Sequence, residues 1–289
     1  MAAVEIEPSP PSHRRMWWAW TLLALILAGL ALLGWGYWVE TWPPLVRRAV
    51  IVFDTPAMAG RKIDVALVSD IHVGSHGMSA ARLDRVVDQI MAQHPDAILL
   101  AGDFVNGDRR NDPAVHLDLL PEALARLHAP LGVYAVLGNH DEWTDPHAVT
   151  ALLRRAGITV LNNQSQGVGP ITLLGLADTP RARLIAAPLL PAARAAGKPV
   201  IVVEHVPRVI PGVPLILAGH THCGQIHLPG ISIAGNPITG NRYYDARFRC
   251  GIVHWQDQIV LIGSGVGSGS FPLRIGTRPD FWMITLTGR

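Results

Sequence analysis

Residues 133–141 read VYAVLGNHD, a stretch in which an apolar run passes directly into Asn139, His140 and Asp141. The run is short and made of aliphatic and aromatic residues, which is typical of a strand buried on both faces. Polar side chains that follow such a strand lie at the carboxyl edge of a sheet, where open α/β folds build their functional sites. We therefore expect chemistry at the end of this strand.

The same arrangement occurs four more times along the chain. Apolar runs at 65–68, 97–100, 200–203 and 214–217 each lead into a short polar block. These blocks are Asp70-Ile71-His72, Gly102-Asp103, Glu204-His205 and Gly219-His220-Thr221-His222. Because the ends of neighbouring parallel strands meet, we expect all five blocks to converge on one rim of a sheet.

The converging side chains have the composition of a metal centre. Seven of them can coordinate a metal directly, with His140 close by: Asp70, His72, Asp103, Asn139, His205, His220 and His222. One tetrahedral zinc ion uses four ligands, whereas two ions about 3.5–4 Å apart would use all seven if they shared a carboxylate. Imidazole mixed with carboxylate and amide oxygen suits Mn, Fe or Zn. We expect two divalent transition-metal ions.

The ordered blocks D-x-H, G-D, G-N-H-D, H and G-H-x-H resemble the calcineurin-like metallophosphoesterase family, and the resemblance covers about residues 63–222. Gly224-Gln225 and residues 261–287 are similar to the membrane-associated bacterial branch of that family. Cys223 is a departure, because that branch usually has glycine after the last block.

The resemblance implies a role for each predicted ligand. Asp70, His72 and His222 would hold the first metal, and Asp103 would bridge the two metals. The further ligands of the second metal would be Asn139, His205 and His220. This assignment places every ligand in one of two overlapping sets.

His140 is implied to be the catalytic acid that protonates the leaving group, and not a ligand. We expect Asp141 to hold the His140 ring by accepting a hydrogen bond from its other nitrogen, which would fix the tautomer. His76 and His227 are further histidines that could face the pocket, although a lone histidine more often has a structural role.

The expected elements of the catalytic domain alternate between strands and helices. Strands are expected at 45–53, 159–161 and 171–176, and helices at 80–93, 117–127, 146–156 and 180–196. The part after Gln225 is rich in strands and in Gly and Pro turns. This order favours an α/β fold of four layers, two mixed β-sheets face to face with helices outside, as the resemblance also implies.

The N-terminal segment predicts a membrane anchor. Residues 16–39 carry no charge over 24 positions, long enough for a helix to cross the hydrocarbon core. Six of the nine tryptophans border this segment, as interfacial belts do. A cleaved signal peptide is the alternative, but its apolar core is shorter and we find no small-x-small cleavage site. We expect a tail at 1–15, an uncleaved anchor at 16–39, a linker at 40–44 and the catalytic domain at 45–289.

The flanking charges predict the orientation of this anchor. Arg14 and Arg15 abut the helix, Arg47 and Arg48 lie farther from its other end, and Glu40 borders the exit. The positive-inside rule then favours a cytoplasmic N-terminus and an extracytoplasmic catalytic domain on a single-pass protein of the bacterial inner membrane. The paired arginines also loosely resemble a twin-arginine export signal.

Two cysteines form no disulfide framework. Cys223 and Cys250 could pair in an oxidising compartment, but we expect free buried thiols.

A net charge of +2 gives no nucleic-acid footprint, so we expect no nucleic-acid partner. The glycine-rich residues 263–270 lack the lysine of a P-loop, and we expect them to form a structural loop or a pocket wall.

The predicted activity is hydrolysis of phosphoester or pyrophosphate bonds by metal-activated water. The motif G-x-S-x-G of serine hydrolases is absent. The anchor favours a phosphorylated substrate that is a small molecule or is linked to a lipid or nucleotide, including the UDP-linked acyl sugars that some relatives cleave. The alternative is a non-catalytic, membrane-tethered binding scaffold on the same fold.

Overall fold

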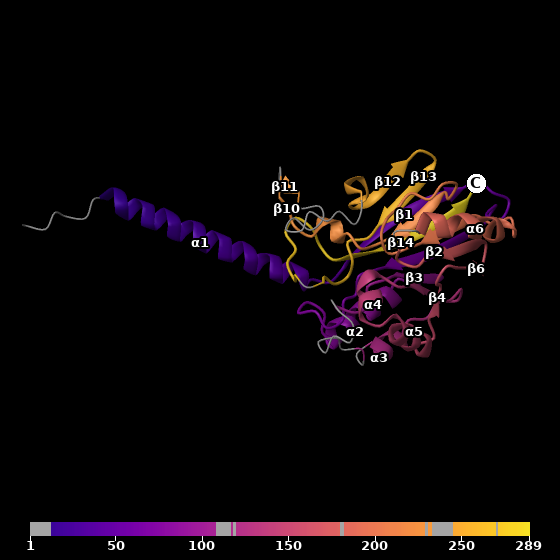
Figure 1. The fold of residues 1–289 in the computed structure, drawn as a ribbon, viewed down its shortest axis with the longest axis horizontal. Helices are drawn as coiled ribbons and strands as arrows, with labels where there is room; N and C mark the ends of the chain where they lie inside the picture. The colour runs from indigo at the N-terminus through magenta and orange to yellow at the C-terminus, as the bar shows by residue number, and fades with distance from the viewer. Residues whose placement is uncertain are drawn as a thin grey trace, which may run out of the picture.

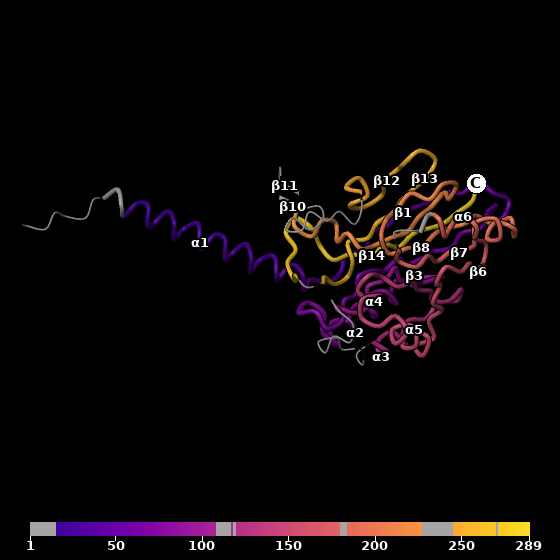
Figure 2. The backbone as a smooth tube through the Cα atoms, viewed as in Figure 1, coloured from indigo at the N-terminus to yellow at the C-terminus, as the bar shows by residue number. Residues whose placement is uncertain are grey.

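Two six-stranded sheets lie face to face, and a long N-terminal helix projects away from them (Figure 1). This architecture comes from a computed structural model, which describes residues 13–107, 117, 120–179, 182–228, 231–232, 245–269 and 271–289. The chain ends at the side of the domain that is remote from the projecting helix (Figure 2).

The first sheet has the strand order β1-β14-β2-β3-β4-β5. Its strands are β1 (Leu45–Phe53), β14 (Asp280–Gly288), β2 (Lys62–Val68), β3 (Ala97–Ala101), β4 (Val133–Val136) and β5 (Thr159–Val160). Strands β2 to β5 are parallel, and β14 is parallel to β1 but antiparallel to β2. The sheet is therefore mixed, and the C-terminal strand lies inside it.

The second sheet has the strand order β12-β13-β9-β8-β7-β6. Its strands are β12 (Gly251–Trp255), β13 (Gln258–Ile262), β9 (Leu215–Ala218), β8 (Val200–Val203), β7 (Ile171–Gly175) and β6 (Gln164–Val168). The four inner strands are parallel, and both edge strands are antiparallel to their neighbours. A separate short pair is formed by β10 (His227–Leu228) and β11 (Ile231–Ser232).

Helices cover the outer face of each sheet, which confirms the predicted layers. The first sheet packs against α2 (Ala80–Met91), α3 (Leu120–Leu124) and α5 (Pro146–Arg155), and the second against α6 (Ala182–Arg194). Successive residues of β2 alternate between layers: Ala66 and Val68 face the helices, whereas Val65 and Leu67 face the other sheet. This alternation explains why the strand sequence is apolar throughout.

Three elements differ from the sequence prediction. A short helix, α4 (Asn139–Thr144), contains the polar block after β4 and was not expected, since it has no apolar period. Strand β6 was missed because four of its five residues are exposed and polar or glycine. The helix expected at 117–127 is observed only as α3, and residues 118–119 lie outside the described part.

The expectation of free thiols is wrong, because Cys223 and Cys250 form a disulfide with a Cα–Cα distance of 4.6 Å. The Thr221 hydroxyl donates a hydrogen bond of 2.6 Å to the carbonyl of Arg249, which holds the two segments side by side. Cys223 has a left-handed backbone, φ 56°, a conformation that favours glycine.

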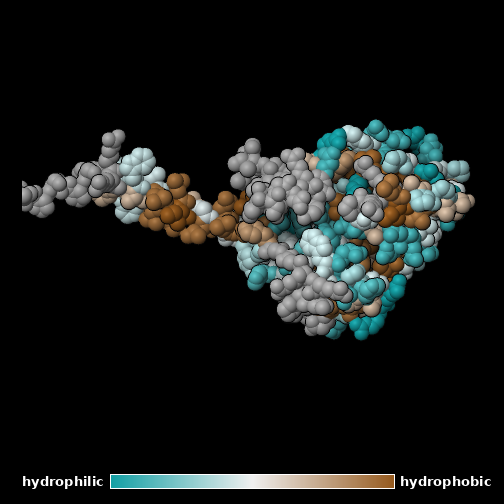
Figure 3. All heavy atoms as spheres, in the orientation of Figure 1, coloured by the Kyte–Doolittle hydropathy of each residue, from teal (hydrophilic) through white to brown (hydrophobic). Residues whose placement is uncertain are grey.

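The projecting helix α1 spans His13–Glu40, and an 18-residue window within Met16–Glu40 has a mean hydropathy of 2.0. It is long and apolar enough to cross a membrane, and hydrophobic atoms cover most of its length (Figure 3). Only its last turns enter the catalytic domain, where Gly36, Val39 and Glu40 are buried.

Candidate metal centre

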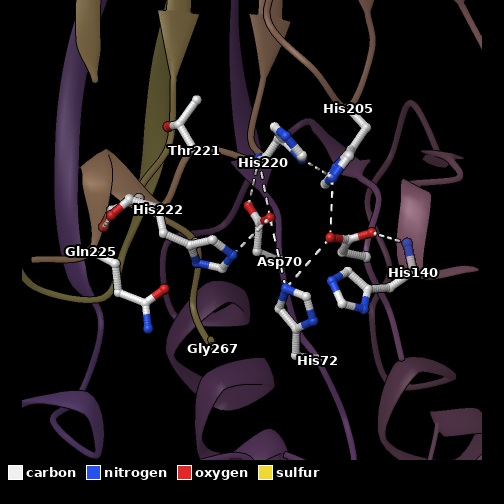
Figure 4. Close-up of polar contacts among 12 residues, drawn as sticks. Asp70, His72, His140, His205, His220, Thr221, His222, Gln225 and Gly267 are labelled. Carbon is white, nitrogen blue, oxygen red and sulfur yellow. Dashed lines mark hydrogen bonds and ion pairs between the residues drawn. The ribbon is translucent and has the colours of Figure 1, made fainter. Parts of the chain in front are cut away.

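The five polar blocks meet at one end of the two facing sheets (Figure 4). Three blocks follow β2, β3 and β4 of the first sheet, and two follow β8 and β9 of the second. The predicted convergence is therefore present, but it spans two sheets and not one rim. The relative position of the sheets sets the distances between the blocks.

The backbone at the predicted ligands is unusual. Positive φ angles between 47° and 68° occur at Asp70, His72, Asp103, His220 and His222. Left-handed backbone costs a non-glycine residue about 1–3 kcal/mol and persists where the surroundings fix it. All five residues lie two or four residues after the end of β2, β3 or β9, so the left-handed backbone occurs in the turns that follow these strands.

Two glycines allow the blocks to approach one another. A Cβ atom on Gly138 would lie 2.2 Å from Oδ1 of Asp103, and one on Gly219 would lie 2.5 Å from Oδ2 of Asp70. Any other residue at these positions would collide with a predicted ligand. The glycines of the G-N-H-D and G-H-x-H blocks are therefore needed for packing against carboxylates.

One cluster brings together Asp70, His72 and His222, whose ligand atoms lie within 4.8 Å of one another. Nε2 of His222 is 3.5 Å from Oδ1 of Asp70, and Nε2 of His72 is 4.0 Å from the same oxygen. Asp70 and His72 are completely buried. We call this set the first cluster.

The second cluster contains Asp103, Asn139, His205 and His220. Nε2 of His205 lies 3.1 Å from each of three atoms: Oδ2 of Asp103, Oδ1 of Asn139 and Nδ1 of His220. Oδ2 of Asp103 is also 3.5 Å from Nε2 of His72 in the first cluster. The Asp103 carboxylate is therefore the group that touches both clusters.

His72 fits a metal ion better than it fits the protein alone. Both of its ring nitrogens are buried and have no hydrogen-bond partner among the described residues. Buried polar atoms without partners are rare and costly, and a bound ion is a usual explanation. Burial lowers the pKa of His72 to about 3, and burial likewise lowers that of His222 to about 3. Both rings are thus neutral, the form that binds metal.

The pKa of His205 is shifted in the opposite direction. Burial alone would lower its pKa, but the charge of the adjacent Asp103 and the hydrogen bond between them outweigh burial and raise the pKa to about 10. Without a cation, the buried carboxylates therefore hold a proton on His205. In the metal-free protein this proton supplies the positive charge that a bound metal ion would otherwise supply.

His140 lies beside both clusters, with its ring centroid 4.8 Å from that of His72. The expected hydrogen bond between its ring and Asp141 is wrong, since Nδ1 of His140 donates instead to the carbonyl of Gly107 at 2.8 Å. This contact still fixes a tautomer, with Nε2 on the other edge of the ring. Trp143, 42% exposed, has its ring centroid 5.0 Å from that of His140.

The carboxylate of Asp141 accepts hydrogen bonds from the backbone and not from the His140 ring. It accepts hydrogen bonds of 2.9 to 3.2 Å from four N–H groups, those of Asp103, Phe104, Val105 and Gly138. Asp141 thereby joins the loop after β3 to the loop after β4. It orients the turn that carries Asp103, a role that its place next to His140 did not indicate.

Sequence reasoning missed two arginines near the site. Arg208 pairs with Glu204 at 3.2 Å and with Asp178 at 3.0 Å, so Glu204 contributes to this ion pair and not to a cluster. Nη2 of Arg274 lies 3.4 Å from Nδ1 of His222. Lone arginines outside a motif give no sequence signal. Among the alternative histidines, His76 is exposed, and the His227 side chain lies outside the described part.

Carboxylate and imidazole side chains gathered at the shared end of two sheets define a metal-dependent hydrolase. A family model described as calcineurin-like phosphoesterase matches residues 63–224. An uncharacterized metallophosphoesterase of Aquifex aeolicus is 30% identical over 241 residues, 80% of this chain and 87% of that protein. The chain belongs to the calcineurin-like phosphoesterase family and is a metal-dependent phosphoesterase, which confirms the predicted resemblance.

Two other relatives add to this comparison. Phosphodiesterase YaeI of Escherichia coli is 27% identical over 257 residues, 85% of this chain and 88% of that protein. A Danio rerio transmembrane protein with a metallophosphoesterase domain is 27% identical over 92% of this chain, which spans 62% of that protein's length. Bacterial and membrane-associated proteins are thus both among the relatives.

The state of His205 predicts how metal binding depends on pH. Below its pKa of about 10 the ring is protonated in the metal-free protein, so binding a metal there must release one proton. We expect the Mn²⁺ affinity of the second cluster to rise about tenfold per pH unit between pH 6 and 8. Titration calorimetry in buffers of different ionisation enthalpy measures both affinity and proton release. An affinity independent of pH would contradict the assignment.

Proposed function

We propose that this chain is a membrane-anchored phosphohydrolase that uses two divalent transition-metal ions, Mn, Fe or Zn, to cleave phosphoester or pyrophosphate bonds with metal-activated water. The observation that carries the proposal is the position of the Asp103 carboxylate, 3.5 Å from His72 and 3.1 Å from His205. A single-ion site would not need a carboxylate shared between two sets of ligands.

The residues have distinct tasks in this proposal. Asp70, His72 and His222 would hold one ion, Asn139, His205 and His220 would hold the other, and Asp103 would be shared between the two sets. Bound metal ions neutralise a phosphoryl group and make water nucleophilic near neutral pH. Nδ1 of His140 donates a hydrogen bond to the carbonyl of Gly107. A proton on the other ring nitrogen, Nε2, can then be donated to the departing oxygen. Asp141 positions the turn of Asp103 and does not contact the His140 ring.

The rim of the site supports a substrate with an apolar group. Trp143 is 42% exposed and lies beside His140. Phe271 is 60% exposed, and its carbonyl accepts a hydrogen bond from the side chain of Gln225. Lipid-linked or nucleotide-linked phosphates match such a rim, and small phosphodiesters match the name of the E. coli relative. The competing proposal is a membrane-tethered scaffold without turnover; a scaffold that also held no metal would leave both ring nitrogens of His72 without a hydrogen-bond partner among the described residues.

We propose that residues 16–39 anchor the protein in the bacterial inner membrane as one span, preceded by a tail at 1–15 and followed by a linker at 40–44 and the catalytic domain at 45–289. The disulfide supports an extracytoplasmic catalytic domain, because disulfides persist in oxidising compartments. This observation adds to the arginine distribution around the helix.

The metal content tests the central proposal. We expect the purified full chain to hold close to two transition-metal ions, to hydrolyse an aryl phosphate or phosphodiester, to lose activity on chelation and to regain it with Mn²⁺. Asp103→Asn should lower kcat/KM by at least about 10²-fold and lower the content of both metals, since metal stabilisation of the transition state amounts to several kcal/mol. Full activity of metal-free protein would refute the proposal, and so would loss of only one ion from Asp103→Asn.

The leaving group tests the role of His140. His140→Ala should keep both metals while kcat falls by about 10²-fold or more for a substrate with an alkyl leaving group, which needs the proton. The loss should be much smaller for a nitrophenyl ester, whose leaving group departs without protonation. Equal losses for both substrates, or loss of metal, would show that the acid lies elsewhere.

The orientation is tested by a reporter fused after Arg289. We expect a reporter enzyme that works only outside the cytoplasm to be active. Thiol titration of protein that is denatured without a reductant should find no free thiol, because both cysteines of the chain are paired. A reporter active in the cytoplasm together with free thiols would reverse the proposed orientation.

A further inference from the structure

The last residue of the membrane helix, Glu40, is completely buried in the catalytic domain. Its Oε2 accepts a hydrogen bond of 2.6 Å from Nε of Arg274, which is also completely buried. Arg82 donates to the carbonyl of Glu40 at 2.7 Å. A buried ion pair loses the hydration of both charges, so apolar residues would attach a helix at lower cost. The Glu40–Arg274 pair is therefore expected to have a role beyond attaching the helix to the domain.

The same two arginines hold the glycine-rich loop between β13 and β14. Nη2 of Arg274 donates to the carbonyls of Ser264 at 2.9 Å and Gly267 at 2.7 Å. Nη2 of Arg82 donates to the carbonyl of Val266 at 2.8 Å. The carboxylate of Glu40 thus orients a guanidinium whose remaining donors fix this loop.

The loop in turn supports Asp70. The N–H of Gly267 donates to the carbonyl of Asp70 at 2.8 Å, and the N–H of Val266 donates to that of Ser69 at 3.1 Å. A Cβ atom on Gly265 would lie 2.6 Å from Cβ of Asp70, so the loop is in close contact with this residue. Gly267 lies beside the site in Figure 4.

Arg274 also reaches the first cluster directly, with Nη2 3.4 Å from Nδ1 of His222. Two of the three residues of the first cluster, Asp70 and His222, therefore depend on contacts that start at Glu40. In the second cluster, Asp103 and His205 have other supports: Asp141 binds the turn of Asp103, and Nδ1 of His205 lies 2.8 Å from the carbonyl of Ala101, whereas the N–H of His220 donates to Asp70 at 3.1 Å. None of these supporting contacts involves α1.

From this asymmetry we infer that Glu40 and Arg274 are positioning residues for the first metal, so that the end of the membrane helix completes one of the two metal sites. The inference rests on the proposed two-metal function. It assigns the anchor a part in metal retention, which a flexible tether would not have. Displacing the helix end would weaken the first site and leave the second intact.

The test uses the full chain in detergent micelles, titrated with Mn²⁺ and followed by electron paramagnetic resonance. The spectrum distinguishes a spin-coupled pair of ions from a single isolated ion. Glu40→Gln keeps the shape of the side chain and removes its charge, and Arg274→Lys keeps the charge and removes the planar fork of donors. For both variants we expect the first ion to bind 10–100-fold more weakly, a range typical for residues that orient metal ligands.

Reference variants identify which site is affected. His72→Ala defines the spectrum after loss of the first site, and His205→Ala defines it after loss of the second. Arg126→Gln removes an exposed ion pair with Asp84 and Asp88 on the catalytic domain and should leave both affinities unchanged. If Glu40→Gln does not fold, the double variant Glu40→Gln/Arg274→Gln removes both charges and is measured with the same expectation.

The outcomes separate the inference from the proposed function. Selective weakening of the first ion in the Glu40 and Arg274 variants supports the inference. Unchanged affinities, or equal weakening of both ions, would overturn it while the two-metal function stands. A wild-type chain that binds only one ion would instead overturn the proposed two-metal function.

Discussion

The constraint on which the site depends is the burial of the Asp103 carboxylate among imidazole rings. An unpaired charge at this depth would be strongly unfavourable, so groups on every side compensate it. The His140 backbone N–H donates to Oδ1 at 2.9 Å, and His205 approaches Oδ2 at 3.1 Å. Gly138 leaves space for Oδ1, and Asp141 fixes the turn that presents the carboxylate.

The position of the site between the two sheets has a further effect on its chemistry. Each cluster takes ligands from both sheets, so the distances between ligands within a cluster are set by the apolar layer that packs the sheets together. Leu67 and Leu99 on one side of that layer, and Ile201 and Leu217 on the other, belong to strands that end in ligands. Close-packed interiors deform little, and the layer therefore acts as a rigid spacer for the metal centre.

The sequence predicted the parts of the structure that depend on local pattern. Apolar runs ending in His, Asp or Asn identified the strands and the residues that the structure brings together. The partner of Asp141 could not be predicted, since its four backbone donors come together only through folding. The disulfide and the Glu40–Arg274 pair were missed for the same reason: their partners lie 27 and 234 residues apart, and no periodicity connects them.

The position of β14 between β1 and β2 has a consequence for how the protein is made. Strand β1 begins five residues after the end of α1, yet its partner in the first sheet is β14, along nine residue pairs that end at Gly288. During synthesis β1 must therefore remain unpaired until β14 has been made. Such long-range pairing slows folding and leaves a strand edge open to wrong partners. The first sheet can therefore be completed only after β14, the last strand in chain order, has been synthesised.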